Sequence, residues 1–210
     1  MRLIGMLDSP YVRRTAVCLD YLQIGFRHES ISVFSNFDKF RAINPVVKAP
    51  TLICDDGTVL MDSTLILQYA EASLSNGRSL WNPDRGLLAH EFRAVSLAMM
   101  ACDKSAQLIY ERNLRPAEAQ YAPWANRVTG QLLAAYAALE QELHAYPSAF
   151  ESDHHHGPIA AAVAWQFSYS MLAAELPADR YPGLVQLSVR QERSAVFRRY
   201  PPAGPGVPGL

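Results

Sequence analysis

Three short segments of the sequence carry groups that could bind a ligand. Ser9 precedes Pro10, an arrangement typical of a helix N-terminus, where a serine hydroxyl and unpaired main-chain N–H groups favour an anion. Asp62 and Ser63 open a second helical pattern, and they offer a carboxylate for an ammonium group and a hydroxyl for a carboxylate. Pro50 precedes a short apolar strand and predicts a tight turn that presents main-chain groups. Taken singly, the two serines and the aspartate are more typical of ordinary helix caps.

The elements around these segments alternate between strand and helix patterns up to residue 76. The pattern predicts, in chain order, a strand at 2–6, a helix at 10–23, a strand at 27–33, a short helix at 37–43, strands at 51–54 and 59–61, and a helix at 63–73. Asp55-Asp56-Gly57 lies between the last two strands and predicts a hairpin. The first domain therefore has the order β-α-β-α-β-β-α, with an antiparallel pair near its end.

The second half of the chain is predicted to be all-helical. Residues 77–83 are rich in turn formers and indicate a linker, residues 84–200 form the helical domain, and residues 201–210 are expected to be a flexible tail. The helical candidates span 87–110, 125–146, 159–172, 182–191 and 194–200. The segment 159–167 is apolar on nearly every side, which predicts a helix buried in the middle of a bundle.

Composition argues against several classes of function. The 210 residues carry a formal net charge of −1, so no global field attracts nucleic acid or an acidic membrane surface. No apolar run approaches the roughly 20 residues of a membrane span, and no signal peptide is evident. We therefore expect a cytoplasmic protein without a nucleic-acid or membrane partner. Cys18, Cys54 and Cys102 lack metal-ligand or redox spacing and are expected to be buried free thiols.

Together these features resemble the glutathione S-transferase superfamily, in particular bacterial members whose first helix begins Ser-Pro-Tyr or Ser-Pro-Phe. The resemblance rests on Ser9-Pro10-Tyr11 after the first strand, Pro50 before the third, Asp62-Ser63 at the last helix of the first domain, and the helical second half. It implies a thioredoxin-like α/β domain at 1–76 followed by an all-α C-terminal bundle. It also implies a homodimer that uses glutathione as co-substrate, without a metal, and accepts a small hydrophobic electrophile, as detoxification enzymes do.

For the catalytic group the resemblance points to Ser9. Its hydroxyl would donate to the glutathione thiolate, and one such hydrogen bond, worth about 1.5–3 kcal/mol, would lower the thiol pKa by about one or two units. Tyr11 is a competing hydroxyl donor, although its position favours the core or the domain interface. At the other end of the ligand, the Ser63 hydroxyl would bind the γ-glutamyl carboxylate and Asp62 would bind the ammonium group.

The middle of the ligand would meet the turn at residues 47–50. In the family the bond before the proline is cis, so Pro50 would let Ala49 offer its main-chain N–H and C=O to the cysteinyl part of glutathione, like an added strand. Lys48 either pairs with the glycyl carboxylate or is an ordinary solvated charge. Related proteins usually carry glycine where this sequence has Val47, a departure that bears on the geometry of the turn.

Other candidate residues have simpler interpretations beside the functional ones. Residues three or four apart on the first long helix could line a second-substrate site together with Tyr11, or could belong to the core; they are Met99, Asp103, Gln107 and Tyr110. Arg13 and Arg14 could line the cleft or be solvated charges, and the second interpretation is favoured for both. The segment 154–156, three histidines, is interpreted as a solvated loop rather than a metal site, because no Asp, Glu or Cys has ligand spacing. His155 and Pro158 replace the family's usual cap of its buried helix.

The favoured hypothesis is a glutathione transferase that activates the glutathione thiol for attack on a small hydrophobic electrophile. A glutathione-dependent isomerase, lyase or dehalogenase is one alternative, because the fold and the glutathione site do not fix the reaction. A non-catalytic module for stress response or protein interaction is the other.

Overall fold

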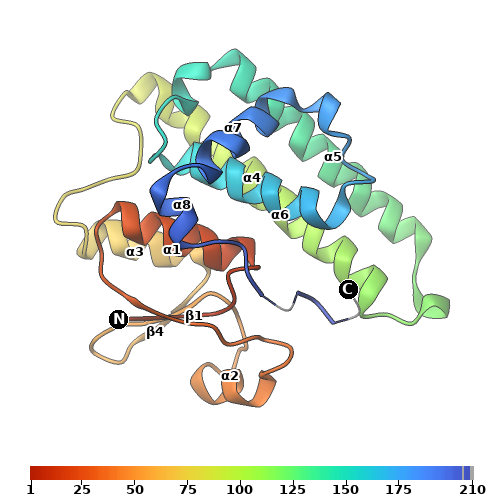
Figure 1. The fold of residues 1–210 in the computed structure, drawn as a ribbon, viewed down its shortest axis with the longest axis horizontal. Helices are drawn as coiled ribbons and strands as arrows, with labels where there is room; N and C mark the ends of the chain where they lie inside the picture. Colours follow the sequence, from red (N-terminus) through yellow and green to blue (C-terminus); the bar gives the residue numbers. More distant parts are fainter. Residues whose placement is uncertain (205, 209–210) are drawn as a thin grey trace. The chain divides into compact units, whose positions relative to one another are not determined.

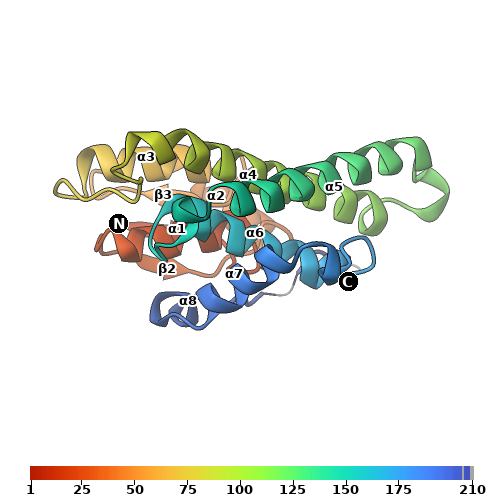
Figure 2. The ribbon, with the colours of Figure 1, turned by 90° about the horizontal axis from the view of Figure 1, so that it is seen from above.

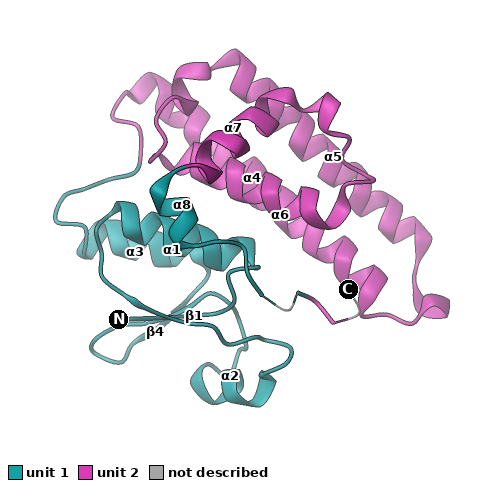
Figure 3. Cartoon of the chain, in the orientation of Figure 1, with its two compact units in different colours: residues 1–80, 194–206 teal, residues 81–193, 207–210 magenta. Residues whose placement is uncertain are grey.

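The structure, a computed structural model, describes residues 1–204 and 206–208 and divides into two compact units (Figure 3). Unit 1 comprises Met1–Leu80 and Ser194–Gly206, whereas unit 2 consists chiefly of Trp81–Arg193. The boundary at Leu80 falls within the segment 77–83, which carries the turn formers.

Unit 1 is built on a four-stranded sheet, with α1 and α3 on one face and α2 on the other (Figure 1). Its first seven elements are β1 (Arg2–Ile4), α1 (Pro10–Tyr21), β2 (Arg27–Glu29), α2 (Phe37–Ile43), β3 (Thr51–Ile53), β4 (Val59–Met61) and α3 (Ser63–Ser73). The strand order is β2-β1-β3-β4, in which β1 runs parallel to β2 and antiparallel to β3. This arrangement confirms the thioredoxin-like topology expected from the sequence.

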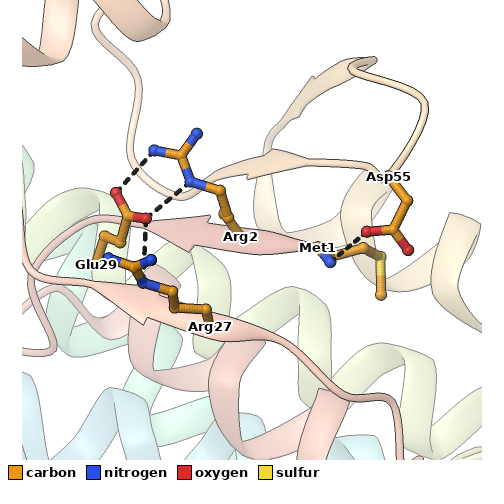
Figure 4. Close-up of polar contacts among 5 residues, drawn as sticks. All are labelled: Met1, Arg2, Arg27, Glu29 and Asp55. Atoms are coloured by element: carbon orange, nitrogen blue, oxygen red, sulfur yellow. Dashed lines mark hydrogen bonds and ion pairs between the residues drawn. The ribbon is translucent and has the colours of Figure 1, made fainter.

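Charged side chains pair across β1 and β2 (Figure 4). Arg2 donates through Nε and Nη2 to the two carboxylate oxygens of Glu29 at 2.8 Å each, and Arg27 Nε lies 3.5 Å from Glu29 Oε1. The hydrogen bonds from Arg2 lower the pKa of the Glu29 carboxyl. The Met1 amino group donates to Asp55 Oδ1 at 2.6 Å. Arg2 and Arg27 lie opposite each other in the parallel pairing of β1 and β2, so both can reach Glu29.

Strand β2 ends at Glu29, so the strand expected at 27–33 is shorter in the structure. The Ser32 hydroxyl oxygen accepts from the N–H groups of Phe34 at 3.1 Å and Ser35 at 3.2 Å, and the Ser32 N–H donates to Asn36 Oδ1 at 3.3 Å. Such local side-chain bonds compete with a sheet ladder and turn the backbone out of the strand.

Helix α8 (Ala195–Arg199) groups with unit 1, although its sequence was assigned to the helical domain at 84–200. The reason is a set of contacts with α1. Arg13 Nε donates to the Tyr200 C=O at 2.8 Å, and the Arg13 guanidinium lies 5.1 Å from the centre of the Phe197 ring. These long-range contacts hold α8 on α1.

The flexible tail expected at 201–210 lies partly outside the described residues, at positions 205, 209 and 210. Within the described part, the Gly206 N–H donates to Asp8 Oδ2 at 2.8 Å. The chain after α8 thus returns to the connection between β1 and α1.

Unit 2 is all-helical, as the sequence predicts (Figure 2). Its helices are α4 (Arg85–Asn113), α5 (Ala122–Ala145), α6 (His156–Leu172) and α7 (Pro182–Glu192), with short 3-10 helices at Ala117–Ala119, Pro147–Phe150 and Ala178–Arg180. α6 packs against α4 and α7, and its residues from His156 to Trp165 are all buried. It is therefore the central helix predicted from its uniformly apolar sequence.

A buried glutamate supplies the cap that α6 lacks in its own sequence. His155 is the N-cap residue, but its side chain makes no capping hydrogen bond. Glu91 of α4 is 0% exposed and accepts from the Gly157 N–H through Oε1 at 3.1 Å and from the Asn82 N–H through Oε2 at 2.7 Å. Burial raises the pKa of the Glu91 carboxyl. The unusual start of α6 at His155 and Pro158 is thus compensated by a contact from another helix.

Two further glutamates bind helix starts in unit 2 in the same way. Glu140 of α5 accepts from the N–H groups of Gly183 at 2.7 Å and Leu184 at 2.9 Å, at the start of α7. Glu111 of α4 accepts from the N–H of Tyr121, the N-cap residue of α5, at 2.8 Å. A carboxylate at a helix N-terminus both satisfies unpaired N–H groups and interacts favourably with the helix dipole.

The structure confirms the prediction for the cysteines and corrects the one for the three histidines at 154–156. Cys18, Cys54 and Cys102 are buried thiols that form no disulfide, which confirms the sequence prediction, and burial raises the pKa of the Cys18 thiol to about 12. His156 is buried with its ring centre 4.3 Å from that of Trp81. The interpretation of 154–156 as a solvated loop is therefore wrong for His156, because this residue forms the first turn of the buried helix α6.

Candidate functional site

The candidate segments of unit 1 emerge at one end of its sheet. Ile4 at the end of β1 pairs with Thr51 at the start of β3, and Thr51 pairs with Met61 at the end of β4. Because these neighbours are antiparallel, the chain leaves β1, enters β3 and leaves β4 at the same end. The register therefore brings together the connection to α1, the turn before β3 and the start of α3.

Ser9 is the N-cap residue of α1, with extended main chain at φ −72° and ψ 122°. Its Oγ accepts from the Val12 N–H at 3.5 Å, so the ordinary capping role is present. Since the oxygen accepts in this contact, the hydroxyl proton can be donated to another group. The N-terminus of α1 adds a partial positive charge beside that proton.

The turn between α2 and β3 is held by two buried polar side chains that the sequence analysis missed. Asn44 donates from Nδ2 to Thr51 Oγ1 at 2.9 Å and accepts from the Val46 N–H at 3.0 Å. The Thr51 hydroxyl donates to the Lys48 C=O at 2.6 Å. The available signal was Asn44 directly before Pro45, because asparagine side chains stabilise turns by bonding to nearby main chain.

Val47, which stands where the resemblance implies glycine, adopts the left-handed conformation, with φ 52°. For a residue other than glycine this conformation costs about 1–2 kcal/mol. Val47 and Ala49 pack against the buried cluster of Ile4, Ile31 and Phe40. Packing therefore holds the turn in a conformation that valine itself disfavours.

We expect Val47→Gly to be more stable than Val47→Ala by about 1 kcal/mol, because both lose the packing of the valine but only glycine escapes the left-handed strain. At an ordinary position the order is reversed, since glycine costs roughly 0.5–1 kcal/mol relative to alanine. Urea unfolding of the two variants measures the difference. An alanine variant at least as stable as the glycine variant would show that the turn carries no such strain.

The Ala49–Pro50 bond is cis, as the resemblance implies. Ala49 lies beside the chain that leaves β1, since a Cβ built at Gly5 would come 3.2 Å from Ala49 Cβ and 2.6 Å from Val12 Cγ2. Gly5 has a φ of 140°. Only a residue without a side chain therefore allows this close approach between the turn and the connection that leads to Ser9.

Asp62 and Ser63 begin α3. Asp62 has a φ of 68° and caps the helix through Oδ1, which accepts from the N–H groups of Thr64 at 2.8 Å and Leu65 at 3.4 Å. Ser63 is buried, and its Oγ accepts from Arg14 Nη1 at 3.3 Å. Ordinary capping thus coexists with an exposed carboxylate beside a helix N-terminus. Such a pair offers complementary groups to the ammonium and carboxylate of an α-amino acid.

Lys48 joins the turn to the first turn of α1. Its side chain is exposed, and Nζ lies 5.6 Å from the centre of the Tyr11 ring, within the range of a cation–π contact. The Tyr11 ring therefore lies next to a cation at the same end of the sheet as Ser9. A second-substrate role for Tyr11 stays a prediction.

Arg13 and Arg14 are each 1% exposed, so their interpretation as solvated charges is wrong. Arg13 contacts α8, as described above, and Arg14 Nη1 donates to Ser63 Oγ and to Thr64 Oγ1, the latter at 3.2 Å. These partners lie 49 and 50 positions away from Arg14 and 187 from Arg13, which is why the local pattern did not reveal them.

The second-substrate candidates of the helical half lie on α4 in unit 2; they are Met99, Asp103, Gln107 and Tyr110. Gln107 Nε2 donates to Asp103 Oδ2 at 2.8 Å, and Lys104 Nζ lies 3.1 Å from the same carboxylate oxygen. Lys104, which the sequence analysis did not consider, adds a cation to this stripe. A second-substrate role for this stripe stays a prediction.

The described part of the chain comprises residues 1–204 and 206–208. This range contains no group of three or more His, Cys, Asp or Glu side chains placed to hold a metal ion. None of its helices has both the length and the apolar character that crossing a membrane requires.

The chain is similar to several known proteins. Residues 3–76 match the family described as the N-terminal domain of glutathione S-transferase. No curated protein sequence gives a significant match. Among solved structures, a glutathione S-transferase of Methylobacterium radiotolerans in complex with glutathione sulfonate is 25% identical, with a TM-score of 0.85 over 98% of this chain and 96% of that one.

Two further structures share the fold at lower identity. A glutathione S-transferase of Methylobacillus flagellatus with bound glutathione is 20% identical, with a TM-score of 0.84 over 96% of this chain and 99% of that one. A maleylacetoacetate isomerase of Methylobacterium extorquens with bound malonate and glutathione is 21% identical, with a TM-score of 0.69 over 99% of this chain and 100% of that one. Residues 3–76 therefore match a glutathione S-transferase N-terminal domain, and the chain as a whole has the glutathione S-transferase fold.

Proposed function

We propose that this protein binds glutathione at the sheet end of unit 1 and activates its thiol for attack on a small hydrophobic electrophile. The observation that carries the proposal is the convergence of three segments, which begin at Ser9, the Ala49–Pro50 turn and Asp62, at one end of the sheet. Two structural relatives have bound glutathione, and a third has bound glutathione sulfonate.

Each segment has a role in this proposal. The Ser9 hydroxyl donates to the thiolate, the main chain of Ala49 before Pro50 pairs with the cysteinyl unit, and Lys48 pairs with the glycyl carboxylate. At the start of α3, Asp62 binds the γ-glutamyl ammonium group and Ser63 binds its carboxylate. Rate enhancement comes from a lowered thiol pKa and from holding the thiolate next to the electrophile. For the second substrate, the stripe on α4 and Tyr11 are each proposed as contact residues.

The test combines calorimetric titration with glutathione and an assay of conjugation to a generic aryl halide. We expect saturable binding and conjugation. Absence of glutathione binding would exclude every enzyme hypothesis and leave the non-catalytic module. Binding without conjugation would favour an isomerase, lyase or dehalogenase, the second candidate function, which is supported by the fold shared with a maleylacetoacetate isomerase.

Ser9→Ala is expected to raise the pKa of enzyme-bound glutathione thiol by about one or two units, because one hydrogen bond to a charged group contributes about 1.5–3 kcal/mol. Thiolate absorbance measured against pH in the two glutathione complexes gives the shift. Ser9→Thr, which retains a hydroxyl, serves as the control. An unchanged thiol pKa in the alanine variant would assign thiolate stabilisation to main-chain donors instead.

We also propose a homodimer in the cytoplasm. Exposed apolar side chains support an interface on each unit: Val59 on β4 and Leu65 on α3 in unit 1, and Phe92 and Met100 on α4 in unit 2. Leu65 is the most exposed of these at 60%. Light scattering after size exclusion gives the mass, and a monomer at all concentrations would contradict the proposal. The cytoplasmic location is supported by the three cysteines, since thiols that form no disulfide are typical of a reducing compartment.

A further inference from the structure

Arg14 is a buried cation directly behind the start of α3. It lies in the second turn of α1 and is 1% exposed, and its Nη1 donates to Ser63 Oγ at 3.3 Å and to Thr64 Oγ1 at 3.2 Å. A guanidinium group loses water when it is buried, so it is retained only where hydrogen bonds compensate that loss. Two of these bonds end on the first two residues of the helix that begins after Asp62.

The direction of these hydrogen bonds decides what Ser63 can do. A guanidinium group has donors and no acceptor, so the Ser63 oxygen must accept from Arg14. A hydroxyl has a single proton, which cannot point back at the guanidinium and is therefore available to another acceptor. Ser63 is the first residue of α3, where main-chain N–H groups and the helix dipole also favour an acceptor with negative charge.

We infer that Arg14 is a positioning residue, which turns the Ser63 hydroxyl into an obligatory donor to the γ-glutamyl carboxylate of glutathione. This inference rests on the proposed function. Arg14 does not itself touch the ligand; it fixes the orientation of the hydroxyl that does. Asp62, whose carboxylate belongs to the ammonium group of the same γ-glutamyl unit, is a separate part of the site that does not depend on Arg14.

The neighbouring residue offers a matched control. Arg13 is equally buried on the same helix, but its guanidinium contacts the Tyr200 C=O and the Phe197 ring on the α8 side. Arg13→Met and Arg14→Met both remove a buried guanidinium and keep a long apolar side chain. Only Arg14→Met removes a donor to Ser63.

The experiment measures dissociation constants by calorimetry for three ligands. They are glutathione, the analogue 4-aminobutyryl-cysteinylglycine, which lacks the γ-glutamyl carboxylate, and glutaryl-cysteinylglycine, which lacks the ammonium group. Arg14→Met is expected to weaken glutathione and the glutaryl analogue about tenfold and the 4-aminobutyryl analogue less than about twofold. Arg13→Met should leave all three constants unchanged. In Ser63→Ala, a further Arg14→Met substitution should add little, since both remove the same donor.

Two outcomes overturn the inference while the proposed function stands: Arg14→Met binds glutathione as the unaltered protein does, or it weakens all three ligands equally. If Arg14→Met does not fold, Arg14→Lys carries the test, because lysine keeps the charge and a donor but loses the planar geometry. Its loss should again be confined to the two ligands that carry the carboxylate, and an equal loss for all three overturns the inference. If the unaltered protein binds no glutathione, the proposed function and this inference both fail.

Discussion

Replacing Glu91 with alanine is expected to lower the free energy of unfolding by about 3–5 kcal/mol. The change leaves the N–H groups of Asn82 and Gly157 without their acceptor in a buried site, and each unsatisfied group costs roughly 1–3 kcal/mol. It also leaves a gap beside Gly157, which Glu91 contacts closely. A Cβ built at Gly157 would lie only 3.0 Å from Glu91 Cγ. Urea unfolding measures the loss.

The control for this change is Glu118→Ala, which removes an exposed glutamate of the same unit and should alter stability by less than about 0.5 kcal/mol. A similarly small effect of Glu91→Ala would show that α6 does not depend on this cap.

Glu91 should also make the stability of the protein depend on pH, in a direction that follows from its raised pKa. Burial raises the pKa of its carboxyl above the ordinary 4.5, so the folded state binds the proton more readily than the unfolded state does. As the pH falls through the raised pKa toward 4.5, the unaltered protein should therefore gain stability relative to Glu91→Gln, which does not titrate. The gain is complete below 4.5 and absent above the raised pKa. Urea unfolding of both proteins across this window measures it, and a difference that shrinks on acidification would contradict the burial effect.

The second large effect is expected at Asp62. Asp62→Asn should weaken glutathione binding about ten- to a hundredfold, because a charge-assisted hydrogen bond is worth about 1.5–3 kcal/mol and each 1.4 kcal/mol is a factor of ten. The asparagine oxygen can still accept from Thr64 and Leu65, and asparagine tolerates the positive φ of this position. The stability of this variant should therefore stay within about 0.5 kcal/mol of the unaltered protein.

Comparing Asp62→Asn with Asp62→Ala separates binding from capping. Alanine should show a similar loss of affinity and, in addition, a loss of about 1 kcal/mol in stability, since the N-cap is gone. Calorimetry with glutathione and with glutaryl-cysteinylglycine provides the readout. The glutaryl ligand lacks the ammonium group and should bind the aspartate and asparagine proteins equally. If the substitution weakened the binding of both ligands equally, Asp62 would not be the residue that binds the ammonium group.

Much of unit 1 could be predicted from sequence because its signals are local. Helix α3 begins and ends as expected, since Asp62 caps it and its apolar residues keep helical spacing. The hairpin of β3 and β4 forms around Asp55-Asp56-Gly57 as its turn residues indicate. Strand β2 is the exception, because the Ser32 side chain forms local hydrogen bonds that alternation alone cannot reveal.

The contacts that the sequence did not reveal join residues far apart in the chain. Arg14 meets Ser63 across 49 positions, and Glu91 meets Gly157 across 66. Neither arginine nor glutamate is expected to be buried from its type alone, and no periodic pattern records which distant partner satisfies it. Ser9 and Asp62 are a different case. The sequence singles them out but does not decide between their two roles, because a helix cap and a ligand donor have the same local signature.

The most direct test of the account is the ultraviolet difference spectrum of the unaltered protein titrated with glutathione at neutral pH. If the site binds glutathione and lowers its thiol pKa, thiolate absorbance will rise and saturate with a stoichiometry of one ligand per chain. A titration that produces no thiolate absorbance, or only a rise that never saturates, would contradict the claim that the sheet end of unit 1 activates glutathione.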